Sequence, residues 1–132
     1  MRLLLVRHAD ALPGEPDAMR ALSPEGREAA RQLGARLHRE GVHPTAILTS
    51  PLLRARETGD ALAIALGCAS EPHDALAPGA TAAGVRTAVA GRGETVIVIG
   101  HQPDCGRIAA ELGDGTEPAF PPAGMAELQL DR

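Results

Sequence analysis

The sequence predicts one α/β domain, residues 1–132, built as a three-layer α/β/α arrangement with helices on both faces of a mainly parallel sheet. Short apolar runs of strand type alternate with longer helical stretches, which is typical of parallel βαβ units. A chain of 132 residues is the size of a single domain. Apolar residues make up 44% of the chain, and its many Ala and Leu residues favour helices on a small sheet over an all-β sandwich.

The first strand and the first helix have clear signals. The apolar run Leu3–Val6 is of buried-strand type. After a loop that contains proline and glycine, Ser23-Pro24-Glu25 supplies an N-cap, a first-turn proline and a first-turn acid. We expect a helix to begin there, with Gly41 as its C-terminal cap.

The middle of the chain repeats this pattern. A second buried strand is predicted at Ala46–Thr49, and Ser50-Pro51 resembles the cap and proline that open the preceding helix. The helix that follows is expected to reach about Leu66. A weaker helix is predicted over Thr81–Ala90, before a glycine.

The last third of the chain contains a strand, a helix and a second strand. Thr95–Ile99 is another buried-strand run, and Pro103–Leu112 is predicted to be helical. Apolar and polar residues alternate over 126–130, which predicts a half-exposed strand at the sheet edge. The segment 113–124, rich in Pro and Gly, is expected to be a surface loop.

Composition excludes several classes of function. The net charge of −4 and a single aromatic residue, Phe120, argue against nucleic acid as a partner. No apolar run is long enough to span a membrane. Cys68 and Cys105 lack metal-type spacing and favour a reducing compartment, so we expect a cytoplasmic location, with a disulfide as the minority interpretation. No cofactor or metal is expected.

Two of the buried strands end in a histidine. Arg7 and His8 follow the first strand, and His101 follows the strand that ends at Ile99. In open α/β sheets, ligands collect at the carboxyl ends of the strands. All 13 basic residues are arginine, whose forked guanidinium matches phosphate oxygens. These features together suggest phosphoryl chemistry.

Three blocks resemble the histidine phosphatase superfamily, whose fold is phosphoglycerate-mutase-like. They read LLVRHADA over 4–11, LTSPLLRARET over 48–58 and VIGHQP over 98–103, in the order that the family shows. The short length and the Arg-His-Ala-Asp-Ala form, with Ala9 in place of a usual glycine, are similar to the small bacterial phosphohistidine phosphatases.

The resemblance implies a role for four residues. His8 would attack phosphorus and become a transient phosphohistidine, while Arg7 would hold the phosphoryl oxygens. Arg54, in the first turn of a helix, would be the second clamp, and His101 would donate to oxygens that gain charge during transfer. Nearby cations would keep the nucleophilic imidazole neutral.

The general acid departs from the family pattern. Many members place a Glu after the third strand, and by register that position is Ala75 here. Asp74 lies one residue away, and in an extended segment this offset can turn a side chain to the other face. Asp74 is therefore a candidate for a weak general acid only. Asp10 is more simply interpreted as a loop-start carboxylate.

The expected activity is removal of phosphate from phosphohistidine on a protein, because an imidazole leaving group depends little on an enzymatic acid. A short chain without room for a lid also favours a phosphorylated protein as the substrate. Three alternatives remain. They are a small-molecule phosphomonoesterase of the same family, a non-catalytic phosphate-binding module, and a metal-dependent hydrolase with ligands among His8, Asp10, His101 and Asp104.

Overall fold

Five strands and four α-helices alternate along residues 1–131, the part of the chain that this computed structural model describes. In chain order they are β1 (Arg2–Arg7), α1 (Pro24–Arg39), β2 (Ala46–Thr49), α2 (Leu53–Leu66), β3 (Ser70–Pro72), α3 (Ala82–Val89), β4 (Thr95–Gly100), α4 (Asp104–Leu112) and β5 (Met125–Gln129). Two short 3-10 helices, η1 (Asp17–Met19) and η2 (Asp74–Leu76), lie in the loops. None of these helices is long and apolar enough to cross a membrane.

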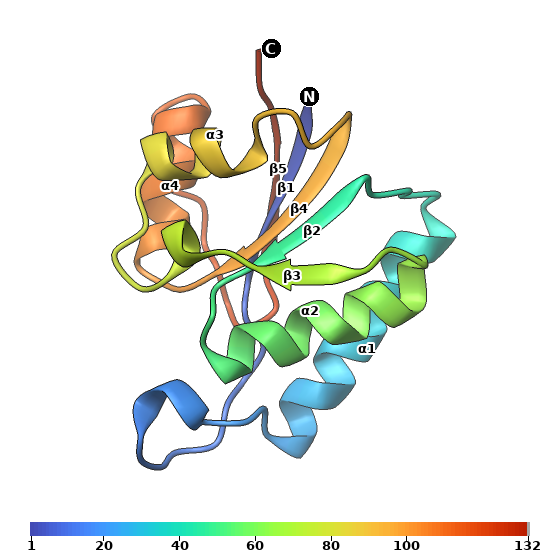
Figure 1. Cartoon of the computed structure of the whole chain (residues 1–132), viewed down its shortest axis with the longest axis vertical. Coiled ribbons are helices and arrows are strands. Elements are labelled where there is room, and N and C mark those ends of the chain that lie inside the picture. The colour runs from blue at the N-terminus through green and yellow to red at the C-terminus, as the bar shows by residue number, and fades with distance from the viewer. Residues whose placement is uncertain (132) are drawn as a thin grey trace.

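The strands form one sheet in the order β3-β2-β4-β1-β5 (Figure 1). The pairs β1 with β4, β2 with β4 and β2 with β3 are parallel, and β5 runs antiparallel to β1 at one edge. The mainly parallel sheet and the half-exposed edge strand that the sequence predicted are both confirmed.

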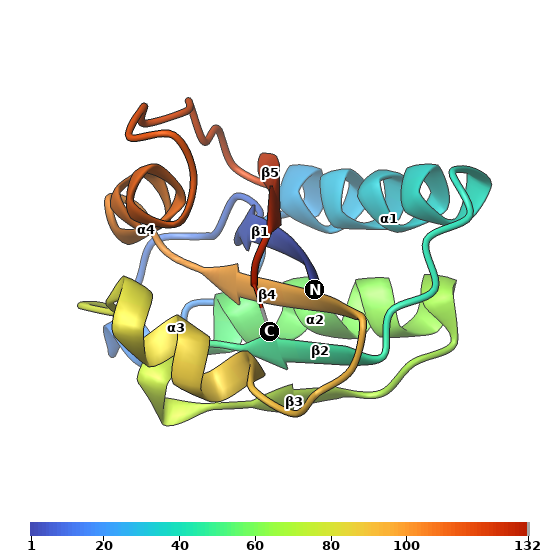
Figure 2. The ribbon, with the colours of Figure 1, turned by 90° about the horizontal axis from the view of Figure 1, so that it is seen from above.

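Side chains of the central strands alternate between two cores, one on each face of the sheet. Leu3 and Leu5 of β1 pack in a cluster with residues of α3 and α4. Leu4 and Val6 pack in a second cluster with residues of α1 and α2. Figure 2 shows these helix pairs on opposite sides of the strands. Strands that are buried on both faces need apolar residues at every position, which explains the continuous apolar runs of β1 and β4.

The start of α2 differs from the prediction. Ser23 caps α1 as expected, accepting a hydrogen bond from the Gly26 N–H at 3.0 Å. The corresponding expectation for Ser50 is wrong, because α2 begins only at Leu53 and its N-cap, Leu52, makes no side-chain cap. The Ser50 hydroxyl instead accepts from the Leu52 N–H at 3.2 Å, in a turn that precedes the helix.

The loop between α4 and β5 reaches back to the end of β1. Its Gly124 carbonyl accepts from the Arg7 N–H at 2.9 Å, and its Ala123 N–H donates to the His8 carbonyl at 3.2 Å. Phe120 of the same loop is buried. The expected surface loop is therefore at the surface only in part, and it supports the main chain where β1 ends.

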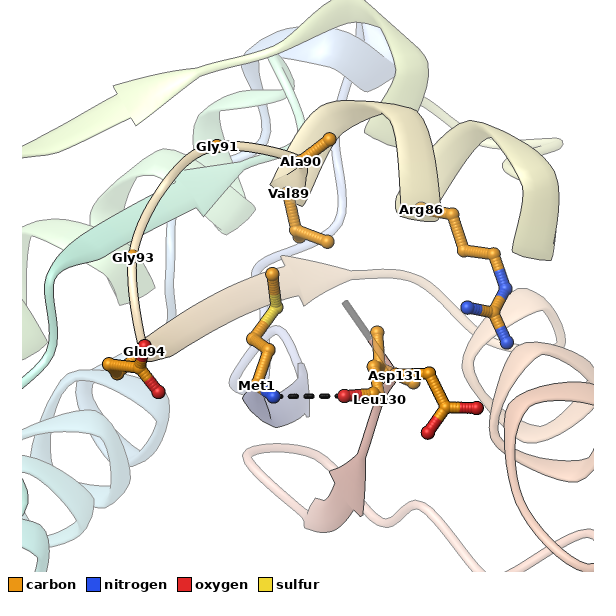
Figure 3. Close-up of a pocket in the computed structure, with 9 residues that line it drawn as sticks. All are labelled: Met1, Arg86, Val89, Ala90, Gly91, Gly93, Glu94, Leu130 and Asp131. Atoms are coloured by element: carbon orange, nitrogen blue, oxygen red, sulfur yellow. Dashed lines mark hydrogen bonds between the residues drawn. The ribbon is translucent and has the colours of Figure 1, made fainter.

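A hollow of about 530 Å³ lies at the amino end of the sheet, beside the two chain termini (Figure 3). Its lining includes the Met1 amine, which donates to the Leu130 carbonyl at 2.8 Å. The lining also carries the cation of Arg86 and the carboxylate of Asp131. Charges of both signs are therefore mixed in the lining of this hollow.

Candidate active site

The carboxyl ends of three parallel strands meet at one edge of the sheet. The His8 N–H, after β1, donates to the Gly100 carbonyl of β4 at 3.0 Å. The Ser50 N–H, after β2, donates to the Ile99 carbonyl of the same strand at 2.9 Å. The rings of His8 and His101 consequently lie close, with centroids 5.1 Å apart and planes inclined by 58°.

A cavity of about 320 Å³ opens at this edge, and all four residues singled out from the sequence line it: Arg7, His8, Arg54 and His101. The rest of its lining consists of Asp10, Ala11, Asp17, Arg20, Pro78, Gln102 and Pro122. Three guanidinium groups around one small cavity can concentrate anions there even though the protein as a whole is negatively charged.

His8 is held in one tautomer. Its Nδ1 lies 2.7 Å from the Ala9 carbonyl oxygen, which can only accept, so the ring proton is on Nδ1 and the lone pair is on Nε2. Burial lowers the pKa of His8, and the positive charges of Arg54 and Arg7 lower it further. The expected effect of the cations is present, with burial as the larger cause. The ring can act as a neutral nucleophile.

The guanidinium of Arg7 is only partly satisfied within the protein. Its Nη1 donates to the Phe120 carbonyl at 3.0 Å, from the loop that supports β1. Its Nε is buried without a hydrogen-bond partner, the one side-chain nitrogen or oxygen atom of this kind in residues 1–131. Buried N–H groups without a partner are rare, so the hydrogen bonding of the Arg7 side chain is not completed by the protein alone.

Arg54 lies in the first turn of α2, almost fully buried, and it already binds an anion from the protein itself. Its Nη1 donates to the Asp17 carbonyl at 2.9 Å, and its Nη2 lies 3.2 Å from the Asp17 carboxylate. Hydrogen bonds from Arg20 and Arg54 hold the pKa of Asp17 below its usual value. The sequence analysis missed Asp17 and Arg20, which lie in an irregular loop without a recognisable spacing.

His101 pairs with Ser50, another residue whose role the sequence analysis missed. The His101 Nε2 lies 2.7 Å from the Oγ of Ser50, which is fully buried. Burial and the neighbouring charges of His8 and Arg54 lower the pKa of His101 to about 4. The sequence feature that could have identified Ser50 is its position directly after the buried strand β2, at the same edge of the sheet as His101.

Thr58 joins the nucleophile loop to the helix that carries Arg54. Its buried Oγ1 accepts from the Ala9 N–H at 3.1 Å and donates to the Arg54 carbonyl at 2.8 Å. One hydroxyl therefore fixes the position of β1's last residues relative to α2. The loop that follows His8 and the helix that carries Arg54 are therefore held together without a ligand.

The two carboxylates considered as acids lie in different places. Asp10 lines the cavity, and its Oδ2 accepts from the Ser23 hydroxyl at 2.7 Å, which agrees with a loop-start role. Asp74 is exposed in η2 and lines a separate hollow of about 310 Å³, which shares Pro78 with the site cavity. A role for Asp74 as a weak acid stays a prediction.

The four residues considered as metal ligands do not gather around one point. The buried Asp104 accepts from the Gly79 N–H at 2.8 Å and from Arg107 Nη2 at 2.5 Å. Among residues 1–131, no three His, Cys, Asp or Glu side chains are arranged to hold a metal ion.

Comparison with known proteins agrees with this geometry. The model of the histidine phosphatase superfamily (branch 1) matches residues 3–78. The chain is 37% identical to an uncharacterized protein of Picosynechococcus sp. over 123 residues, which is 87% of this chain and 74% of that protein. It is 32% identical to the phosphohistidine phosphatase SixA of Escherichia coli (strain K12), over 99% of this chain and 86% of SixA.

A solved structure extends the likeness to the whole fold. The protein histidine phosphatase SixA complexed with tungstate superposes with a TM-score of 0.90 at 29% identity, over 99% of this chain and 89% of that one. The matched family segment holds Arg7, His8 and Arg54, and the structural match extends the likeness beyond it to the rest of the chain. The chain belongs to the histidine phosphatase superfamily and is a phosphatase of the SixA-like type.

Proposed function

We propose that this phosphatase removes the phosphoryl group from phosphohistidine on a protein, through a covalent intermediate on the Nε2 of His8. The observation that carries the proposal is the hydrogen bond from His8 Nδ1 to the Ala9 carbonyl, because it leaves the lone pair of a neutral ring on Nε2. The relatives named as phosphohistidine phosphatases support the choice of substrate.

Arg7 and Arg54 bind the phosphoryl oxygens in this proposal. Arg7 offers its unpartnered Nε, and Arg54 offers the Nη2 that now faces Asp17. Both guanidiniums keep one hydrogen bond to a main-chain carbonyl, of Phe120 and Asp17 respectively, so they are oriented before substrate binds. His101 donates to an oxygen that gains negative charge as the phosphoryl group moves.

The reaction takes two steps. In the first, the Nε2 lone pair of His8 forms a bond to phosphorus while the bond from phosphorus to the substrate imidazole breaks, and its electron pair goes to the imidazole nitrogen. The substrate ring carries a proton from solvent on its other nitrogen, so it leaves as neutral imidazole. In the second step, water attacks the phosphorus on His8, the bond from Nε2 to phosphorus breaks, and inorganic phosphate leaves as the water proton passes to solvent.

The lining carboxylates favour an imidazole over an alkoxide as the leaving group. Asp10 is bound by Ser23, and Asp17 is bound by two arginines that stabilise its ionised form. An alkoxide needs a proton from an acid in the site, whereas the ring of phosphohistidine can take its proton from solvent and leave as neutral imidazole. The proposed compartment is the cytoplasm, in keeping with the free thiols of Cys68 and Cys105.

The test compares four phosphate donors with the purified protein in excess chelator: a protein phosphorylated on histidine, free phosphohistidine, para-nitrophenyl phosphate and an alkyl phosphate. We expect the highest kcat/KM on the histidine-phosphorylated protein. A higher value on the alkyl phosphate would favour the small-molecule phosphomonoesterase. Binding of phosphate without turnover of any donor would indicate a non-catalytic module, and loss of activity in chelator would indicate a metal enzyme.

A further inference from the structure

Large apolar side chains are exposed beside the active-site cavity. Among residues 1–131, three large apolar side chains are exposed: Leu12 by 45%, Met19 by 60% and Ile64 by 86%. Leu12 and Met19 belong to the segment between β1 and α1, residues 11–22, which we call the 11–22 arm. None of these three side chains lines the cavity itself, and Ile64 lies apart from the arm, on α2.

The arm forms one wall of the site. Ala11, Asp17 and Arg20 of the arm line the cavity, so Met19 is the chain neighbour of one lining residue and Leu12 of another. Figure 1 shows this segment, in blue, projecting from the body at the end of the molecule opposite the two termini. Residues 12–19 are all exposed.

The arm is held in shape by hydrogen bonds of its own. The Leu12 N–H donates to the Ala21 carbonyl at 2.8 Å, and Arg20 Nε donates to the Leu12 carbonyl at 2.7 Å. Arg54 fixes Asp17 from the body of the protein. A partner would therefore meet a preformed surface, which lowers the entropy cost of binding.

A protein substrate that reaches His8 comes close to the walls of the cavity, of which the arm is one. The imidazole side chain is short, so a phosphohistidine whose phosphorus reaches His8 brings its own main chain to the mouth of the cavity. Pro78 and Pro122, both exposed, stand in the lining together with the arm. Exposed apolar side chains in one wall of a cavity that holds three arginines fit a surface on which apolar side chains lie beside one phosphorylated histidine.

We propose that the 11–22 arm, through Leu12 and Met19, is the docking surface for the folded protein that carries the phosphohistidine. This inference rests on the proposed function and adds where the substrate protein binds. Exposed apolar side chains gain free energy when a partner covers them. Arg20, with its charge on the cavity side of the arm, completes the complementarity to a phosphate on that partner.

The test compares Leu12→Ser/Met19→Ser with the wild type and with Ile64→Ser, a matched change of an exposed apolar residue away from the site. The probes are a folded protein with one surface phosphohistidine, made with phosphoramidate, and free phosphohistidine. We expect the wild type to prefer the protein, and the double variant to lose about tenfold in kcat/KM on the protein, as for a truncated interface anchor. Its kcat/KM on free phosphohistidine stays unchanged, and Ile64→Ser matches the wild type on both probes.

Each other outcome overturns the inference. No loss on the protein probe, an equal loss on both probes, or a wild type without preference for the protein would show that the arm does not dock the substrate. Failure of the proposed function looks different, because the wild type would then hydrolyse para-nitrophenyl phosphate and neither phosphohistidine probe.

Discussion

The Oγ of Ser50 lies 2.7 Å from the Nε2 of His101 and is a hydrogen-bond partner of that ring nitrogen. The Leu52 N–H already donates to Ser50 Oγ, so the hydroxyl proton needs an acceptor, and Nε2 is within reach. We therefore assign the proton of the neutral His101 ring to Nδ1. This nitrogen is not left buried without a hydrogen-bond partner. His101 then has an N–H to offer to phosphate without being charged.

Ser50→Ala should lower kcat by about tenfold, which is the effect of one lost hydrogen bond, with little change in KM. The ¹⁵N chemical shifts of His101 should show the proton moving toward Nε2. Ser70→Ala, which removes a serine hydroxyl bonded to Asp60 away from the cavity, is the matched control. A lower kcat with unchanged His101 shifts would contradict the assignment.

His8→Ala should lower phosphatase turnover on the order of a thousandfold or more, since removal of a nucleophile abolishes the covalent route. Circular dichroism should be unchanged, because the ring is bonded only to the neighbouring Ala9 carbonyl. In the wild type, rapid denaturation during turnover should trap phosphate on His8 in an acid-labile, base-stable bond. Comparable turnover in the variant would exclude His8 as the nucleophile.

Acid should destabilise the fold between the ordinary histidine pKa of 6.5 and the His101 value of about 4. In this window the unfolded chain binds a proton at His101 and the folded chain does not, so the free energy of unfolding falls as the pH falls. The shift corresponds to about 3 kcal/mol for this buried ring. Urea unfolding at pH 7, 5.5 and 4 should give a flatter pH dependence for His101→Gln; equal slopes would argue against the lowered pKa.

Asp17→Asn should strengthen inhibition by inorganic phosphate several-fold. The Asp17 carboxylate competes with phosphate for Arg54 Nη2 and repels it, whereas an amide keeps the polar contact without the charge. The measurement is the phosphate inhibition constant at low salt, with Asp114→Asn as a control for loss of one exposed negative charge. Weaker inhibition in Asp17→Asn would mean that the carboxylate mainly orients Arg54.

Asp74→Asn tests the weak general acid. Because Asp74 lies outside the site cavity, we expect hydrolysis of phosphohistidine to change less than twofold. Hydrolysis of an alkyl phosphate, which depends on a proton donor, should fall further if Asp74 reaches the leaving group. An equal and large loss on both substrates would instead point to damage to the η2 loop.

Much of this site could be predicted from the sequence because its parts follow buried strands. Arg7, His8 and His101 stand directly after apolar runs, and strand ends of a parallel sheet meet at one edge. Arg54 was identifiable from its place at the start of a helix and from the family resemblance.

The remaining contacts depend on tertiary packing that no spacing encodes. Ser50 has a typical capping context, and only the position of His101 shows that its hydroxyl is used elsewhere. Asp17 reaches Arg54 across 37 residues, from an irregular loop. The start of that loop packs closely on α1 at Gly26, where a Cβ would come within 2.0 Å of the Asp10 carbonyl oxygen.

The loop before β5 lies outside all three motifs, yet it holds Arg7 and His8 in position at the end of β1. Phe120 supplies the carbonyl that orients the Arg7 guanidinium, and the main chain at 123–124 bonds the residues that carry the site. A shortened protein ending near Gly113 would keep all three motifs, but Arg7 would lose the hydrogen bond to the Phe120 carbonyl that orients its guanidinium.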